Sequence, residues 1–242
     1  MSVPAGGDEW GRISESCSAQ FNLSVEVTGS LRGPHLVRYP LKPGPGVKVV
    51  SLVTRAQDVQ MALGCAVTPA IAAGPGHVHL DVPNDVPETV HWKEIVDLIP
   101  ADDWSGPLAF PVGMGIDGKP IVIDFTNSST CHLLVAGVSG SGKSEFLKAM
   151  VATLIHRNRP EALRLTVVDP KILTFAALRG SPYLEGDVIT DIQDAVERLE
   201  AAVALMDRRY RSLADDGYEN LLEKHKAGDR SDPFLVLIFD EF

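Results

Sequence analysis

Hydrophobic residues follow different patterns in the two halves of the chain. In the first half they alternate with polar residues, as between Phe21 and Val27 and between Val78 and Val82, which predicts half-buried strands. The second half instead contains apolar runs at Leu133–Ala136, Leu163–Val168 and Phe234–Phe239. Such runs are typical of parallel strands that are buried on both faces. We therefore expect a small α+β domain followed by an α/β domain with a mainly parallel sheet.

Apolar residues at helical spacing predict two helices in the second half. The first stripe comprises Leu147, Met150, Val151, Leu154 and Ile155. The second comprises Ile192, Val196, Leu199, Val203, Met206 and Tyr210. We expect the second stripe to face the core, and its helix to start at the capping box Thr190-x-x-Gln193 and to end before Gly217.

Turn residues and composition suggest how the chain divides. Val47–Leu52 is predicted to be a strand, and a helix is expected from the capping box Thr54-x-x-Gln57 to Gly64. Asp117-Gly118 between apolar runs predicts a hairpin. We assign residues 1–20 to a flexible tail or short helix, 21–105 to the small α+β domain and 106–242 to the α/β domain.

The residues that follow Leu133–Ala136 match the phosphate-binding pattern G-x-x-x-x-G-K-[ST] in full. They are Gly137, Val138, Ser139, Gly140, Ser141, Gly142, Lys143 and Ser144, followed by Glu145. Glycines let backbone N–H groups turn inward around a phosphate, and the next helix points its positive dipole end at the same anion. Lys143 adds a charge for the β- and γ-phosphates, and the Ser144 hydroxyl is placed to ligate Mg²⁺. We predict that residues 137–145 bind ATP; the alternative is an ordinary glycine-rich turn.

The last apolar run ends in the acidic pair Asp240-Glu241. Carboxylates at the tip of a buried strand are costly unless they serve a cation or a reaction. Beside a phosphate loop, the pair is typical of a Walker B element, in which Asp240 holds Mg²⁺ and Glu241 polarises the attacking water. We therefore predict Lys143 and Glu241 as catalytic residues and Ser144 and Asp240 as metal ligands. The alternative is a solvated acidic turn.

The sequence does not decide the roles of two further groups of charged residues. Asp169 and Lys171 follow the run Leu163–Val168, where parallel sheets bind ligands, but a charged turn without nucleotide contact fits equally well. Arg208, Arg209 and Arg211 lie near the end of the second predicted helix. They can complement its dipole, or contact phosphate or a neighbouring subunit.

Composition narrows the class of protein. The chain of 242 residues carries 22 Lys and Arg against 32 Asp and Glu, for a net charge of −10. This balance argues against a surface that is basic all over, although a local patch or a ring lumen could still hold nucleic acid. We expect no membrane segment, because no apolar run approaches the roughly 20 residues of a span. Three scattered cysteines fit a reducing cytoplasm better than a disulfide framework.

The ordered set of motifs resembles the FtsK/SpoIIIE family of DNA-translocating ATPases. The matching pieces, which stand between about Phe21 and the end of the chain, are Gly33-Pro34, Pro43–Val49, Val82-Pro83-Asn84, His132–Gly137, the phosphate loop, Val168–Lys171, Val188–Asp191, Arg208-Arg209-Tyr210 and Asp240-Glu241-Phe242. The resemblance implies an α domain followed by a RecA-like P-loop domain. It also implies a hexameric ring that pumps double-stranded DNA, with Lys143, Ser144, Asp240 and Glu241 in the roles given above.

The resemblance also sets out what this chain would lack. The family's membrane anchor and DNA-reading γ domain have no counterpart, and no sheet strand follows Phe242, so we expect a fragment or a split product with the RecA-like sheet cut after the Walker B strand. The leading functional hypothesis is an ATP-dependent DNA translocase motor. Two alternatives are an ATPase of a protein-secretion system and a nucleotide-binding assembly module without turnover.

Overall fold

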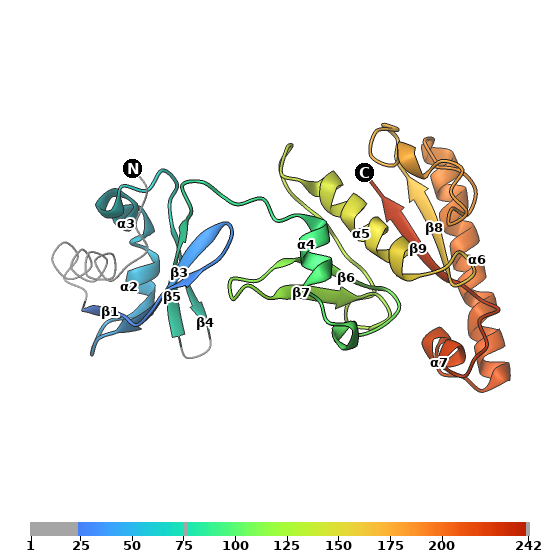
Figure 1. Cartoon of the computed structure of the whole chain (residues 1–242), viewed down its shortest axis with the longest axis horizontal. Helices are drawn as coiled ribbons and strands as arrows, with labels where there is room; N and C mark the ends of the chain where they lie inside the picture. The colour runs from blue at the N-terminus through green and yellow to red at the C-terminus, as the bar shows by residue number, and fades with distance from the viewer. Residues whose placement is uncertain (1–23, 75–76, 241–242) are drawn as a thin grey trace. The chain divides into compact units, whose positions relative to one another are not determined.

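The computed structural model describes residues 24–74 and 77–240 (Figure 1). The chain divides into two compact units. Unit 1 comprises Met1–Ile99 with Gly113–Ile121, and unit 2 comprises Pro100–Val112 with Val122–Phe242. The tail or helix expected over residues 1–20 lies outside the described residues.

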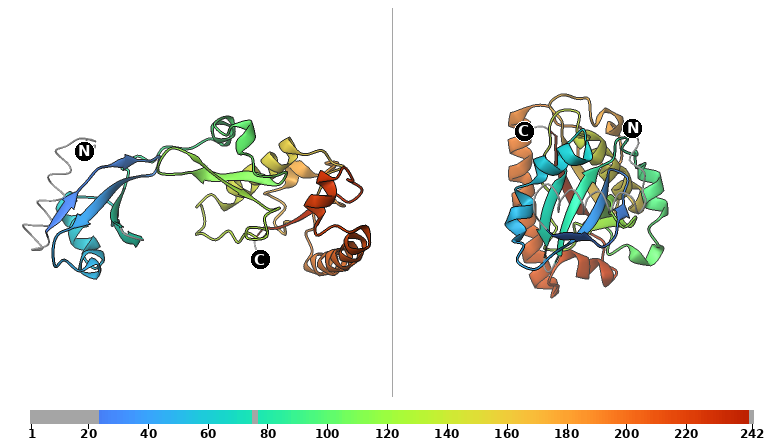
Figure 2. Two further views of the ribbon diagram at one scale, coloured as in Figure 1. Left: turned by 90° about the horizontal axis from the view of Figure 1, so that it is seen from below. Right: turned by 90° about the vertical axis from the view of Figure 1, so that its left-hand side faces the viewer.

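Unit 1 is built on a five-stranded antiparallel sheet in the order β1-β3-β5-β4, with β2 beside β3. Its strands are β1 (Val25–Val27), β2 (Leu31–Arg32), β3 (Leu36–Pro43), β4 (Ala70–Gly74) and β5 (His77–Pro83). Helices α2 (Val49–Val53) and α3 (Ala56–Leu63) lie against this sheet (Figures 1 and 2). The predicted alternation in β5 is confirmed, because Val78, Leu80 and Val82 are all buried.

The strand predicted at Val47–Leu52 is wrong, since helix α2 occupies most of it. Short apolar runs fit either structure, and here the run forms a helix that buries Leu52 in the core of unit 1. The predicted helix stop at Gly64 is confirmed, with Gly64 in the left-handed conformation at φ 69°. The predicted capping box is not used, because Thr54 Oγ1 donates to the carbonyl of Val50 at the end of α2 instead.

Two of the short sequence motifs meet in unit 1. The side-chain amide of Asn84 donates to the carbonyl oxygens of Gly33 at 3.0 Å and of Pro34 at 2.9 Å. The Asn84 main-chain N–H donates to the carbonyl of His35 at 2.9 Å. Asn84 therefore ties the Gly33-Pro34 turn to the end of β5, which is a structural role.

A hairpin is shared between the two units. It consists of β6 (Ala109–Met114) and β7 (Pro120–Asp124), and its tip turns at Gly118 with φ 75°. The hairpin predicted from Asp117-Gly118 is thereby confirmed. Helix α4 (Trp92–Asp97) and a 3₁₀ turn (Ala101–Asp103) precede the hairpin along the chain.

Unit 2 contains the two buried strands that the sequence predicts, β8 (Leu163–Val168) and β9 (Phe234–Phe239). They pair in parallel, from Leu163 opposite Phe234 to Val168 opposite Phe239. On its other edge β8 is bonded to the extended segment 183–189, for example from the N–H of Leu165 to the carbonyl of Tyr183 at 2.8 Å.

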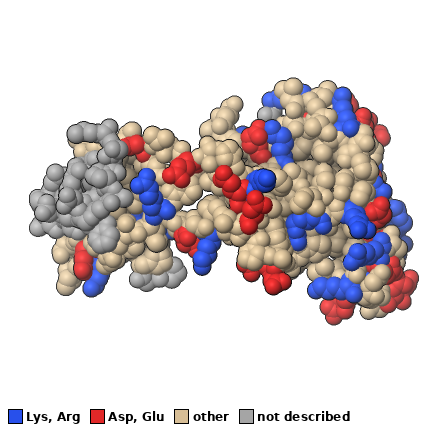
Figure 3. Space-filling view, in the orientation of Figure 1, with Lys and Arg blue, Asp and Glu red and all other residues tan. Residues whose placement is uncertain are grey.

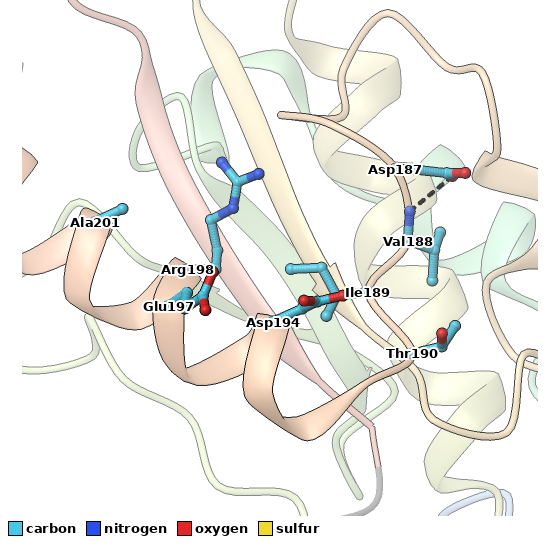
Figure 4. A pocket seen from close by; sticks show the side chains of 8 residues that line it. All are labelled: Asp187, Val188, Ile189, Thr190, Asp194, Glu197, Arg198 and Ala201. Atoms are coloured by element: carbon cyan, nitrogen blue, oxygen red, sulfur yellow. Dashed lines mark hydrogen bonds between the residues drawn. The ribbon is translucent and has the colours of Figure 1, made fainter.

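Helices flank the β8–β9 pair on both sides. Helix α5 (Lys143–Arg157) buries Met150, Val151 and Leu154 against one face of the strands. Helix α6 (Ile192–Asp216) lies on the other side (Figures 1 and 4), and α7 (Leu221–Lys226) follows it. A second 3₁₀ turn spans Ala176–Leu178. The result is the mixed α/β arrangement expected for a P-loop ATPase core.

Two expectations for unit 2 are wrong. Leu133–Ala136 forms no strand, and Leu134 is 92% exposed. A strand needs a hydrogen-bonded neighbour, and no segment of the described chain pairs with Leu133–Ala136. The stripe on α6 does not face the core either, since all six of its members are exposed while Ala195 and Leu213 are the buried residues of that helix.

Candidate nucleotide-binding site

The phosphate loop adopts the backbone conformation that its glycines predict. Gly140 and Gly142 both have positive φ, at 78° and 93°, and helix α5 begins immediately afterwards at Lys143. The loop is tightened by a hydrogen bond from the N–H of Ser141 to the carbonyl of Val138 at 3.1 Å. At Gly137 a Cβ would collide with the Ser141 side chain, so a larger residue cannot take this position without a shift. These glycines leave a loop whose backbone can approach a phosphate closely.

The Lys143 ammonium group lies over this loop. Its Nζ donates to the carbonyl of Gly137 at 2.7 Å and to that of Val138 at 3.3 Å. These acceptors are the first two residues of the loop and Lys143 is near its end, so the side chain of Lys143 reaches from one end of the loop to the other. The positive charge is therefore held at the place where the phosphate pattern requires it.

Ser144 and Glu145 lie in the first turn of α5. Ser144 is half-buried, whereas Glu145 is exposed and accepts from Lys148 Nζ at 2.5 Å along the helix surface. An acidic residue in the first turn is favourable for the helix dipole, so this pair explains Glu145 without a ligand.

Asp240 is buried directly after β9, with 6% of its surface exposed. Its main-chain N–H donates to the carbonyl of Val168 at 2.9 Å, but its carboxylate accepts no hydrogen bond from the described part of the chain. The carboxylate oxygens are not among the described side-chain atoms that are sealed from solvent without a partner, so a cation can reach them, and Asp240 fits a divalent metal ion. Glu241, the predicted catalytic partner, lies outside the described residues.

The phosphate loop and Asp240 lie at the same end of unit 2. Figure 1 shows α5 running antiparallel to β9, so the start of the helix and the end of the strand are at one side of the sheet. The carboxyl ends of parallel strands are where such sheets bind ligands. The chain thus brings a phosphate-binding loop and a carboxylate that accepts no hydrogen bond from the described residues to the same edge.

Asp169 occupies the equivalent position after β8, but its carboxylate already accepts hydrogen bonds from three main-chain N–H groups. Its oxygens accept from the N–H groups of Ile172 at 2.9 Å, Thr174 at 2.9 Å and Phe175 at 3.0 Å, and the residue is 1% exposed. These bonds support Ile172 in the left-handed region at φ 60°, which is unfavourable for a β-branched residue. Of the two interpretations of Asp169, these bonds favour the charged turn, in which the carboxylate organises its own loop.

A buried cation near the end of α6 was not predicted from the sequence. Lys224 on α7 is buried, and its Nζ lies 3.3 Å from Asp216, 3.6 Å from Asp229 and 3.1 Å from Asp232. The hydrogen bond to Asp232 is the main reason why the pKa of Lys224 is raised. The signal in the sequence was six acidic residues around two lysines between 215 and 232, which also fits a solvated surface.

Arg209 belongs to the same region. Its Nε lies 3.6 Å from Asp232, the carboxylate that Lys224 also contacts. This contact anchors Arg209 to the segment that leads into β9, so of the cluster Arg208, Arg209 and Arg211 one member has a structural role.

The far end of α5 is held by Arg157. Its guanidinium donates to the carbonyls of Gly106 and Ala109, both at 2.9 Å, and lies over the Trp104 ring at 4.1 Å. Burial lowers the pKa of Arg157, and the nearby Asp124 opposes that shift. These contacts fix α5, and with it the phosphate loop at its other end, to the segment before β6.

Comparison with known proteins identifies two family domains in the chain. The model described as the FtsK/SpoIIIE family matches residues 93–238, and that of the FtsK alpha domain matches residues 9–84. A DNA translocase FtsK from Pseudomonas putida is 34% identical over 213 residues, 87% of this chain and 25% of that protein. One from Campylobacter jejuni is 36% identical over 228 residues, 92% of this chain and 24% of that protein. The chain thus spans about a quarter of the length of these relatives.

Two solved structures are similar in fold. The conjugation coupling protein TcpA of pCW3, solved in a monomer form with ATPγS, aligns with 96% of this chain and 64% of its own, at a TM-score of 0.53 and 16% identity. The cytoplasmic domain of the type VII secretion ATPase EccC from Thermomonospora curvata aligns with 63% of this chain and 21% of its own, at a TM-score of 0.50 and 28% identity. Among the described residues no helix is long and apolar enough to cross a bilayer. With a family model matched over more than half of its length, the chain belongs to the FtsK/SpoIIIE family.

Proposed function

We propose that this chain is part of an ATP-driven motor that moves double-stranded DNA in the cytoplasm. The observation that carries the proposal is that the Lys143 loop and the buried residue Asp240, whose carboxylate has no donor among the described residues, lie at the same end of unit 2. Relatives that are 34% and 36% identical over most of this chain are named DNA translocases, which supports the choice of DNA as the substrate.

The residues of the site have separable roles. The backbone N–H groups of residues 137–144 bind phosphate oxygens, and Lys143 neutralises charge on the β- and γ-phosphates. Ser144 and Asp240 would hold Mg²⁺, and Glu241 would polarise the attacking water. When bound, magnesium–ATP supplies a γ-phosphoryl group whose transfer to water releases free energy for movement. Asp169 and Arg157 contribute indirectly, by holding the adjacent loop and helix in place.

DNA contact is expected to be local. The net charge of −10 disfavours binding over the whole surface, and on the face drawn in Figure 3 basic and acidic side chains are interspersed. A ring of identical subunits would gather one basic patch from each copy around a central duplex. We therefore propose a hexameric ring as the working assembly.

The test is ATP hydrolysis by the 242-residue chain with and without linear duplex DNA. We expect hydrolysis that rises with added duplex and that disappears in Lys143→Ala. A rate of ATP hydrolysis that does not change when duplex DNA is added would contradict the choice of DNA as the substrate. Nucleotide binding without any turnover, even at concentrations that permit assembly, would instead indicate an assembly module.

A second candidate is the ATPase of a protein-secretion system. The specific observation in its favour is the 28% identity to a type VII secretion ATPase over 63% of this chain. Stimulation of hydrolysis by a substrate polypeptide, and not by duplex DNA, would favour this candidate over the translocase.

A further inference from the structure

Asp169 and Asp240 follow neighbouring strands at the same level of the sheet. The main-chain N–H of Asp240 donates to the carbonyl of Val168 at 2.9 Å. This bond extends the parallel ladder in which Val168 lies opposite Phe239. Asp169 is therefore the neighbour of Asp240 across the ladder, and neighbouring strands are only about 4.8 Å apart.

The two aspartates also share a face of the sheet. Side chains alternate between the faces along a strand, and one alternating set from each strand packs in the core cluster with α5: Leu163, Leu165 and Val167 of β8, and Phe234, Val236 and Ile238 of β9. Asp169 and Asp240 are the next members of these sets. Phe175, whose N–H donates to Asp169, belongs to the same cluster. Both carboxylates are therefore on the α5 side, where the phosphate loop begins that helix.

The hydrogen bonds of Asp169 keep its carboxylate in place and away from the role of a metal ligand. Three main-chain N–H groups donate to it, and these donors would lose their acceptor if the side chain turned toward a cation at Asp240. Its negative charge still acts at a distance. Because the residue is only 1% exposed, water and salt screen that charge weakly. Lys171 in the same loop is exposed, so its opposing charge is screened more strongly.

A fixed negative charge at this place has opposite effects on the two forms of the nucleotide. It repels the phosphates of metal-free ATP, and it attracts the Mg²⁺ of magnesium-bound ATP. The positive charge of Lys143 attracts the triphosphate in both forms. Asp240 supplies one carboxylate for the cation, and Asp169 adds a second negative charge that its own loop holds beside the first.

We propose that Asp169 is a specificity-determining residue, whose charge makes the site select magnesium-bound ATP over metal-free ATP without contact to either. This inference rests on the proposed function, because it requires the magnesium–ATP site at the phosphate loop and Asp240. It gives Asp169 an electrostatic role in addition to its role in organising the loop.

The test measures the affinity of the 242-residue chain for ATPγS by isothermal titration calorimetry, once in EDTA and once in excess MgCl₂. We call the ratio of these two affinities the magnesium gain. Asp169→Asn keeps an oxygen that accepts from the same N–H groups but removes the charge. We expect its affinity in EDTA to equal or exceed that of the wild type, and its magnesium gain to be about fivefold smaller. A purely structural defect would instead lower both affinities together.

Two further variants separate charge from structure. Asp169→Glu keeps the charge while its longer side chain disturbs the same hydrogen bonds, so its magnesium gain should stay within about twofold of the wild type. The matched control is Asp124→Asn. Asp124 is also buried and also accepts from a turn N–H, that of Thr126 at 2.8 Å, but it lies near Arg157 at the far end of α5. Its magnesium gain should also stay within about twofold, and circular dichroism should confirm that all three variants fold.

The outcomes distinguish this inference from the proposed function. If Asp169→Asn loses affinity equally in EDTA and in MgCl₂, or keeps the full magnesium gain, the charge of Asp169 does not select the nucleotide form. A magnesium gain that falls as far in Asp169→Glu as in Asp169→Asn would lead to the same conclusion. Each of these results overturns the inference and leaves the proposed motor in place. A wild type whose affinity for ATPγS does not respond to Mg²⁺ would contradict the magnesium–ATP site itself, and with it both proposals.

Discussion

The main-chain N–H of Asp240 donates to the carbonyl oxygen of Val168 at 2.9 Å. This bond continues the parallel pairing of β8 and β9 by one residue, so the carboxylates of Asp169 and Asp240 follow adjacent strand ends. Both residues are buried, yet their environments differ. Asp169 accepts three backbone N–H groups, whereas the Asp240 carboxylate accepts none from the described residues. The first carboxylate is part of the fold, and the second is available for a cation.

Asp240→Asn tests whether the Asp240 carboxylate is free to bind a cation. Without metal, we expect the free energy of unfolding to change by less than about 0.5 kcal/mol, because the carboxylate has no donor to lose among the described residues and its oxygens are not sealed from solvent. ATP hydrolysis should be lost, since a carboxamide is a poor Mg²⁺ ligand. Urea unfolding in EDTA measures the first effect and phosphate release the second. The exposed Asp85→Asn should change neither, and a destabilised Asp240→Asn would mean that the carboxylate is already satisfied.

Asp169→Ala, by contrast, should destabilise the folded protein. It leaves three buried N–H groups without an acceptor, and we expect a loss of about 3 kcal/mol in the free energy of unfolding. Amide hydrogen exchange at Thr174 and Phe175 should accelerate, because both N–H groups donate to Asp169. Leu173→Ala in the same loop is the control, and at 81% exposure it should cost less than about 0.5 kcal/mol. If amide hydrogen exchange at these two residues is unchanged in Asp169→Ala, Asp169 does not organise this loop.

Lys143→Ala addresses the phosphate loop itself. Charged hydrogen bonds contribute about 1.5–3 kcal/mol, so we expect the affinity for ATP to fall at least about tenfold. The fold should persist, because Lys143 contacts only carbonyls of its own loop. Isothermal titration with a non-hydrolysable ATP analogue measures the affinity, and Lys148→Ala, one turn further along α5, is the control. Equal affinity in wild type and Lys143→Ala would rule out the phosphate assignment.

The sequence predicted the elements whose stability is decided locally or by burial on both faces. β8 and β9 begin and end where the apolar runs do, and Gly64, Gly118 and Gly217 stop helices or turn chains as expected. The phosphate loop was found for the same reason, since its conformation depends on glycines within a few residues of one another.

The predictions that failed needed knowledge of partners. Leu133–Ala136 is as apolar as β9, but a strand also requires a neighbour, which a linear pattern does not show. The apolar stripe of α6 has a core-like spacing, but spacing alone does not show whether any segment packs on it. Lys224 was missed because three of its carboxylates come from segments on either side of it that only the fold brings together.

The ion cluster around Lys224 predicts a specific response to acid. A hydrogen bond from the N–H of Ser231, together with Lys224, lowers the pKa of Asp229 below its ordinary value of 3.8. Protonation is therefore easier in the unfolded chain, so the stability that Asp229 contributes is present above pH 3.8 and is lost as pH falls through the lower folded value. Lys224 does not contribute to this acid response. Its pKa is raised, so the stability that its charge contributes is lost only as pH rises above 10.5.

Urea unfolding of unit 2 between pH 7 and pH 3, roughly the range in which carboxylates titrate, measures this response. We expect stability to fall below about pH 4, and to fall less steeply in Asp229→Asn, which has no proton to gain. Asp215→Asn is the control, because this exposed residue on α6 forms no ion pair with Lys224. If Asp229→Asn and the wild type lose stability in parallel, the acid response comes from other carboxylates and the cluster around Lys224 is not its source.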